Sequence, residues 1–127
     1  AANAVVRASA FFDAKTDGLT KEWPGRVFLN PPYAPPLVSQ FSAKFREEFH
    51  AGRMTQGIAL VNNATETKWF QELASCASAI AFPLGRIQFW HPSKTSIPLQ
   101  GQAIVYAGPN AANFRRVFGA FGLTVLL

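Results

Sequence analysis

Residues 27–33 read Val-Phe-Leu-Asn-Pro-Pro-Tyr, and this stretch indicates the fold. Three apolar, strand-prone residues end abruptly at a side-chain amide, two prolines and an aromatic ring. Proline has no N–H and a fixed φ angle, so we expect a stiff corner whose hydrogen-bond acceptors keep one direction. In an α/β sheet, ligands bind beyond the carboxyl ends of the strands, which is where this corner falls.

A long amphipathic helix is predicted directly after the corner, beginning at Pro35 or Pro36 and ending near Gly52. Its apolar stripe recurs every four residues and comprises Leu37, Phe41, Phe45 and Phe49. The charged residues expected off that stripe are Lys44, Arg46, Glu47 and Glu48. This stripe predicts core packing rather than a ligand site.

The rest of the chain alternates shorter apolar runs with helical patterns. We predict strands over 26–29, 58–61, 79–82, 86–90, 103–107 and 123–126, and loops over 15–25 and 91–100. Helices are predicted over 4–12, 65–76 and 110–121. Thr65 is expected to cap the second of these helices, and the third is expected to turn Phe114, Val117, Phe118 and Phe121 inward. Strand 103–107 is expected to pair with 86–90. The alternation predicts a single α/β domain over 1–127 with a mostly parallel sheet. Asn62 and Asn63 follow one strand as Asn30 follows another, so we expect these asparagines at one edge.

Composition excludes several classes of protein. With 127 residues, 49% of them hydrophobic, the chain is long enough for a core and is no disordered tail. We find no apolar run long enough to span a bilayer and no signal peptide, and expect a cytoplasmic protein. A single cysteine, Cys76, forbids an internal disulfide and is expected to be buried. The two histidines lack further ligands at metal-site spacing, so no metal site is predicted.

The formal net charge of +5 favours a polyanionic partner such as nucleic acid. The basic residues are scattered along the sequence and form no single tract, and the oligomeric state stays open.

The polar corner contains the hydrogen-bond acceptors that are needed to hold an amino group. The amide oxygen of Asn30 and the carbonyl of Pro31 are two acceptors for the two hydrogens of an exocyclic amine. Such bonds would turn the lone pair of the amine toward a methyl donor, while Tyr33 stacks on the base. An ordinary turn is the alternative, because Asn-Pro and Pro-Pro mark loops in many proteins.

Five segments in one order resemble the phage-type Dam-like DNA N6-adenine methyltransferases. They are Asp17-Gly18-Leu19, Trp23, the NPPY motif of residues 30–33, Thr65-Glu66-Thr67-Lys68-Trp69-Phe70 and Gly85-Arg86-Ile87-Gln88-Phe89. The resemblance implies a site-specific DNA adenine methyltransferase that uses S-adenosylmethionine and acts on a flipped adenine in double-stranded DNA. It also implies a Rossmann-like sheet with one reversed strand near the C-terminus. The family has a further upstream segment that helps to hold the cofactor, so we expect the sequence to be N-terminally incomplete.

The resemblance also implies roles for individual residues. The catalytic set is Asn30, Pro31, Pro32 and Tyr33, and the cofactor-binding set is Asp17, Gly18, Leu19 and Asn30. Asp17 would accept a bond from the adenine amino group of the cofactor and Leu19 would pack on its ring, although Asp-Gly is also a common turn.

The expected nucleic-acid contacts are Tyr33, Arg86 and Lys94. Arg86 either binds a phosphate or holds a loop carbonyl, and Lys94 either meets a phosphate or lies in a solvated loop. Trp23 is expected to anchor its loop rather than to contact a base.

Two rival interpretations stay open. One is an amino methyltransferase acting on an RNA base or on a protein glutamine. The other is a non-catalytic nucleic-acid-binding remnant of such a domain.

Overall fold

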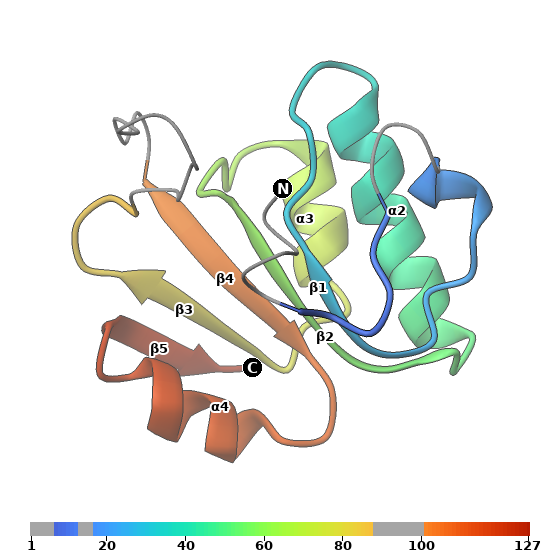
Figure 1. Cartoon of the computed structure of the whole chain (residues 1–127). Helices are drawn as coiled ribbons and strands as arrows, with labels where there is room; N and C mark the ends of the chain where they lie inside the picture. Colours follow the sequence, from blue (N-terminus) through green and yellow to red (C-terminus); the bar gives the residue numbers. More distant parts are fainter. Residues whose placement is uncertain (1–6, 13–16, 88–100) are drawn as a thin grey trace.

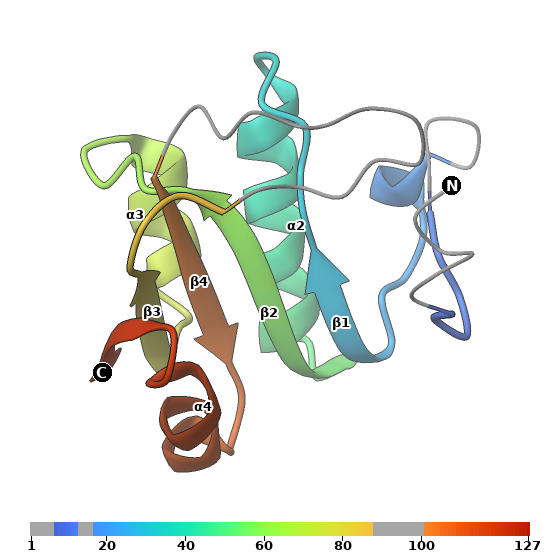
Figure 2. The ribbon, with the colours of Figure 1, turned by 60° about the vertical axis from the view of Figure 1, so that its left-hand side comes forward.

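A five-stranded sheet forms the middle layer of this computed structural model, with helices on both of its faces (Figure 1). The structure describes residues 7–12, 17–87 and 101–127. Its elements are η1 (Gly18–Thr20), β1 (Gly25–Leu29), α2 (Leu37–His50), β2 (Met54–Asn62), α3 (Lys68–Ala74), β3 (Ala79–Pro83), β4 (Gln102–Ala107), α4 (Ala111–Phe118) and β5 (Gly122–Leu126). Helices α2 and α3 cover one face of the sheet, and α4 lies on the other (Figures 1 and 2).

The prediction of a mostly parallel sheet is wrong. The strand order is β1-β2-β4-β3-β5, and only β1 and β2 pair in parallel. The other three pairs, β2 with β4, β3 with β4 and β3 with β5, are antiparallel. Strands β1, β2 and β3 therefore run in one direction and β4 and β5 in the other. Because β4 inserts between β2 and β3, it replaces what would be one parallel pair with two antiparallel pairs.

The main core lies between the sheet and the helices α2 and α3. Phe45 of α2, Leu73 of α3 and Val61 of β2 are fully buried there. Gly57 of β2 lies directly against this layer, since a Cβ atom at that position would come within 2.5 Å of Met54 Sδ and 2.8 Å of Phe45 Cε2. The absence of a side chain at Gly57 thus lets α2 approach β2 closely.

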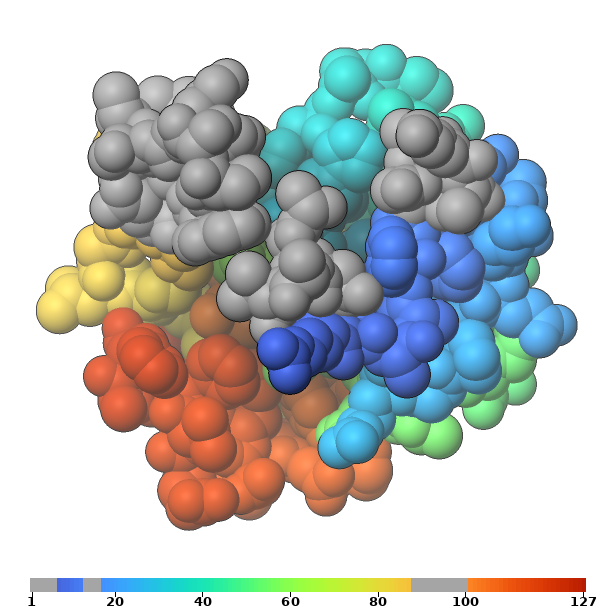
Figure 3. Space-filling model, viewed as in Figure 1, coloured from blue at the N-terminus to red at the C-terminus, as the bar shows by residue number. Residues whose placement is uncertain are grey.

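A second core lies on the opposite face, under α4. Phe114 stacks on Tyr106 of β4 with ring centroids 5.0 Å apart, and Phe118 stacks on Phe114 at 4.5 Å. In the space-filling view, α4 and β5 form the lower left of the front face, and the segments around β1 form the right (Figure 3). The expected inward position is confirmed for Phe114, whereas Val117 and Phe121 are exposed.

The predicted strands 26–29, 58–61, 79–82, 103–107 and 123–126 are confirmed within a few residues, and so is the long helix. The helix predicted over 4–12 is wrong for residues 7–12, which are not helical. Helix α3 is capped by Thr67, whose Oγ1 accepts a bond from the Phe70 N–H at 3.2 Å, and not by Thr65. Of the predicted strand 86–90, residues 86 and 87 are not in a strand, and 88–90 lie outside the described residues with the loop 91–100.

The burial predicted for the residues of α2 is most clearly wrong at Glu48. It was expected off the apolar stripe, but its side chain is 0% exposed. An α-helix repeats every 3.6 residues, so a stripe read at steps of four drifts by about 40° per step. The buried positions of α2 are Val38, Ser42, Phe45 and Glu48, whose spacing of four, three and three residues keeps them on one face of the helix.

Candidate active site

The NPPY corner follows β1 at the edge of the sheet where β1 and β2 both end. In this parallel pair, Phe28 lies opposite Ile58 and Leu29 opposite Ala59, so the carboxyl ends of both strands reach the same edge. Asn30 is exposed there, while Pro31 is buried and fixes the chain directly after it. The structure therefore places exposed Asn30 directly before a buried proline, at the end of the sheet where α/β proteins bind ligands.

Tyr33 crosses from the end of β1 to the end of β2. Its hydroxyl oxygen accepts a hydrogen bond from the main-chain N–H of Asn62 at 2.8 Å. Its ring is partly buried and lies 6.2 Å from the Trp69 ring at an interplanar angle of 51°. Burial raises the pKa of Tyr33 more than the bond from Asn62 lowers it, so the phenol is protonated at neutral pH.

The end of β2 is in turn bonded to β4. Gln102 Nε2 donates to Asn62 Oδ1 at 2.8 Å, and the Asn63 N–H donates to the Gly101 carbonyl at 3.1 Å. Among the residues that the structure describes, the buried Gln102 Oε1 has no hydrogen-bond partner. The sequence placed Asn62 and Asn63 at this edge, and their bonds show that both help to hold it.

The Asp17-Gly18-Leu19 segment forms the start of η1. Asp17 has a left-handed backbone, with φ at 48°, and its side chain is exposed. Gly18 is buried, and a Cβ atom there would lie 3.1 Å from Phe12 Cβ, tighter than an ordinary contact. Figure 2 shows η1 beyond the carboxyl end of β1 rather than beside its start. The predicted cofactor residues and the NPPY corner thus lie toward the same end of the sheet.

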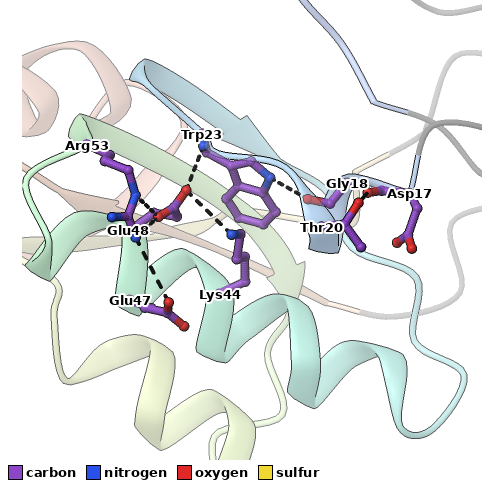
Figure 4. A network of polar contacts seen from close by, with 8 residues as sticks. All are labelled: Asp17, Gly18, Thr20, Trp23, Lys44, Glu47, Glu48 and Arg53. Carbon is purple, nitrogen blue, oxygen red and sulfur yellow. Dashed lines mark hydrogen bonds and ion pairs between the residues drawn. The ribbon is translucent and has the colours of Figure 1, made fainter.

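Trp23 connects this segment to the core, which confirms its expected anchoring role. Its indole Nε1–H donates to the Gly18 carbonyl at 2.9 Å, and its ring stacks on Phe41 at 6.1 Å. Its main-chain N–H donates to Glu48 Oε1 at 2.7 Å. Figure 4 shows the resulting network, in which one buried carboxylate contacts the loop before β1 and two cations.

Glu48 is the residue of this network that sequence reasoning missed. It forms an ion pair with Arg53, which also donates to it through Nε, and Lys44 Nζ lies 3.5 Å from Oε1. Burial alone would raise the pKa of Glu48, but the bonds from Trp23 and Arg53 and the charges of Lys44 and Arg53 outweigh it and lower the pKa. The available signal was its position three residues after Phe45 on the 3.6-residue period of α2.

Of the three predicted nucleic-acid contacts, the described part of the chain contains Tyr33 and Arg86, and these two follow different strands. Arg86 is exposed and follows β3, which lies three strand positions from β1 in the sheet order, or roughly 14 Å at ordinary strand spacing. Lys94 lies outside the described residues. Of the two described residues of this set, Tyr33 lies at the NPPY corner and Arg86 follows a different strand.

Cys76 is buried as expected, and burial raises the pKa of its thiol, which excludes a reactive thiolate at neutral pH. Within the described ranges, no three His, Cys, Asp or Glu residues are grouped so as to hold a metal ion. No helix in that part of the chain is long and apolar enough to cross a membrane.

A hollow of about 160 Å³ lies on the sheet near the start of β1, lined by residues that include Arg26, Gln56 and Tyr106. It contains none of the NPPY residues, so it is not the expected base pocket.

A comparison with protein-family models matches most of the chain. The family model described as DNA N-6-adenine-methyltransferase (Dam) matches residues 1–110, which covers most of the chain and ends before α4 and β5. No curated protein and no solved structure matches the chain. On the extent of the family match, the chain belongs to the DNA N-6-adenine-methyltransferase (Dam) family.

Proposed function

We propose that this protein transfers a methyl group from S-adenosylmethionine to the N6 amine of an adenine swung out of double-stranded DNA. The family match supports the reaction class and the nucleic-acid substrate. The observation that carries the proposal is the exposed Asn30 amide, held next to buried Pro31 at the shared carboxyl edge of two parallel strands.

The geometry of the corner suits a weak nucleophile. The lone pair of an exocyclic amine is delocalised into the base, so it needs help to attack. The Asn30 side-chain oxygen and the Pro31 carbonyl accept the two amine hydrogens and turn the lone pair out of the ring plane. These bonds strengthen as positive charge develops on the nitrogen, so the corner favours the transition state over the ground state.

Tyr33 supplies the surface on which the flipped base stacks, and Pro32 keeps the backbone between the two functions rigid. Base–aromatic stacking contributes about 1–3 kcal/mol per base, enough to offset much of the cost of unstacking. Because the Tyr33 hydroxyl is bonded to Asn62, the ring has a fixed orientation before the base arrives. Preorganisation of this kind shortens the search for the reactive geometry.

The residues of the Asp17 loop fit a purine nucleoside. The exposed carboxylate of Asp17 is an acceptor for an amino edge, and the partly buried Leu19 offers an apolar contact for the ring. When bound, S-adenosylmethionine supplies an electrophilic methyl group on a sulfonium centre. No general base is needed before transfer, because the amine proton becomes acidic only as the new bond forms.

The test is methyl incorporation from isotopically labelled S-adenosylmethionine with double-stranded DNA, RNA and protein offered in parallel. The proposal predicts label in N6-methyladenine of digested DNA, identified by mass spectrometry, and its loss in Asn30→Ala. Label in an RNA base or in glutamine would overturn the substrate. Absence of transfer, together with no heat on titration of S-adenosylhomocysteine, would favour the non-catalytic interpretation.

A further inference from the structure

The Glu48 carboxylate contacts one distant main-chain N–H and two cations that lie within five residues of it in the sequence. The main-chain N–H of Trp23 lies 2.7 Å from Oε1, Arg53 donates to Oε2 from the start of β2, and Lys44 Nζ lies one helical turn away at 3.5 Å (Figure 4). The carboxylate is 0% exposed. A buried ion pair is a weak means of stabilising a fold, since apolar residues of similar volume often serve as well.

The distinctive feature of this carboxylate is its bond to the main chain of a loop. Glu48 is on α2, but Oε1 accepts from Trp23, 25 residues earlier in the chain. Trp23 has no regular secondary structure to fix it, because it lies between η1 and β1. The bond therefore sets where the loop passes over α2.

Trp23 carries this constraint to the Asp17-Gly18-Leu19 segment. Its indole Nε1–H donates to the Gly18 carbonyl at 2.9 Å, and both groups are buried. The indole ring stacks on Phe41 at an interplanar angle of 19°, and Lys44 Nζ lies 5.9 Å from the centroid of the indole ring. Glu48, Trp23 and Gly18 thus form one continuous chain of contacts that ends at the left-handed Asp17.

We propose that Glu48 is a positioning residue for the cofactor loop, acting through Trp23 to hold Gly18 and, with it, the Asp17 carboxylate and the Leu19 side chain. This inference rests on the proposed function, because it assigns a role in binding S-adenosylmethionine. In this role Glu48 and Trp23 act through the loop and not by contact with the cofactor or the base.

The sharpest variant is Trp23→Phe, which keeps an aromatic ring on Phe41 and the main-chain bond to Glu48 but removes the donor to Gly18. A single hydrogen bond of this kind contributes about 0.5–1.5 kcal/mol, or roughly a 2- to 10-fold change in an equilibrium constant. We expect the dissociation constant for S-adenosylhomocysteine and the KM for the methyl donor to rise by that factor, with kcat at saturating donor within about twofold of wild type. Glu48→Gln replaces a charged acceptor that Arg53 holds in place by a neutral one, which weakens the bond from Trp23, so the same constants should rise in the same direction.

The matched control is Glu47→Gln. Glu47 precedes Glu48 on α2 and also approaches Arg53, at 3.9 Å, but its side chain is 70% exposed, and Figure 4 joins it to Arg53 and not to the loop. Its affinity for S-adenosylhomocysteine should equal that of wild type.

Amide hydrogen exchange over residues 17–22 provides a readout that does not depend on the cofactor. Faster exchange there in Trp23→Phe and Glu48→Gln, together with the weaker ligand affinity, would support the proposal. Faster exchange with unchanged affinity, or unchanged exchange in a folded Trp23→Phe variant, would overturn it. If the wild-type protein binds S-adenosylhomocysteine, either of those results leaves the proposed function intact; if the wild type does not bind it, the cofactor assignment and this inference both fail.

Discussion

The hydroxyl of Tyr33 accepts a hydrogen bond from the main-chain N–H of Asn62, with 2.8 Å between oxygen and nitrogen. The bond joins the segment after β1 to the last residue of β2, so the ends of the two parallel strands are held together by a side chain. It also fixes the ring proposed to carry the base. The position of Tyr33 is thus set by both folding and the proposed chemistry, and the two can be separated by substitution.

Tyr33→Phe removes the acceptor but keeps the ring. The Asn62 N–H loses its partner, so we expect the free energy of unfolding in urea to fall by about 1 kcal/mol. Methyl transfer should fall only modestly, whereas Tyr33→Ala, which removes the stacking surface, should reduce it strongly. A Phe variant as inactive as the Ala variant would contradict stacking.

Tyr106→Phe is the matched control for this substitution. The Tyr106 hydroxyl also accepts a main-chain N–H, from Asn110 at 2.9 Å, and donates to Gln56. Loss of the Tyr106 hydroxyl should lower the free energy of unfolding at least as much as loss of the Tyr33 hydroxyl does. Methyl transfer by Tyr106→Phe should equal that of wild type.

Glu48 predicts a specific acid dependence of stability. The pKa of Glu48 is lowered in the folded protein. In acid, the folded protein therefore binds fewer protons at this side chain than the unfolded chain does. The stability that it contributes is present above the ordinary glutamate pKa of about 4.3 and is lost as the pH falls through the lowered folded value. The free energy of unfolding of Glu48→Gln, measured from pH 7 to pH 3, should therefore decline less steeply than that of wild type.

Glu47→Gln is the control for the substitution itself, because Glu47 is mostly exposed, and its free energy of unfolding at pH 7 should lie within about 0.5 kcal/mol of wild type. Parallel curves for Glu48→Gln and wild type would show that the buried carboxylate adds no acid-sensitive stability.

Two phenylalanines provide a test of the core. Phe45 of α2 is 0% exposed in the core between this helix and the sheet, whereas Phe28 of β1 is 66% exposed on the opposite face of the sheet. Phe45→Ala should lower the free energy of unfolding by about 3–5 kcal/mol, as expected for a large buried side chain. Phe28→Ala should change it by less than about 0.5 kcal/mol, as at other surface positions. An equal loss for both, measured by chemical denaturation, would mean that the face bearing Phe28 is covered in solution.

The apolar runs predicted the strands and α2 because the spacing of apolar residues within each segment indicates which residues are buried. Strand direction depends instead on which neighbour a strand meets. Nothing in residues 102–107 indicates that they insert between β2 and β3, and this insertion is what makes the sheet mostly antiparallel.

The site shows the same division between local and long-range information. The NPPY corner was predicted as a local feature, and the structure presents Asn30 at the expected edge. The bonds that hold it join residues distant in sequence, such as Tyr33 with Asn62 and Trp23 with Glu48. The position of Glu48 on the period of α2 was the local sign of its burial, but the partner that ties it to the loop, the main-chain N–H of Trp23, lies 25 residues away and could not be inferred locally.

The central claim is that the Asn30 amide holds the amine that is methylated, and the most direct measurement is the turnover of Asn30→Ala at saturating donor and DNA. The account predicts a loss of roughly 100-fold or more, as when one transition-state hydrogen bond is removed. Asn113→Ala serves as the control, since Asn113 is an exposed asparagine of α4 that bonds Arg116, and its turnover should match wild type. Near-normal methyl transfer by folded Asn30→Ala would contradict the account.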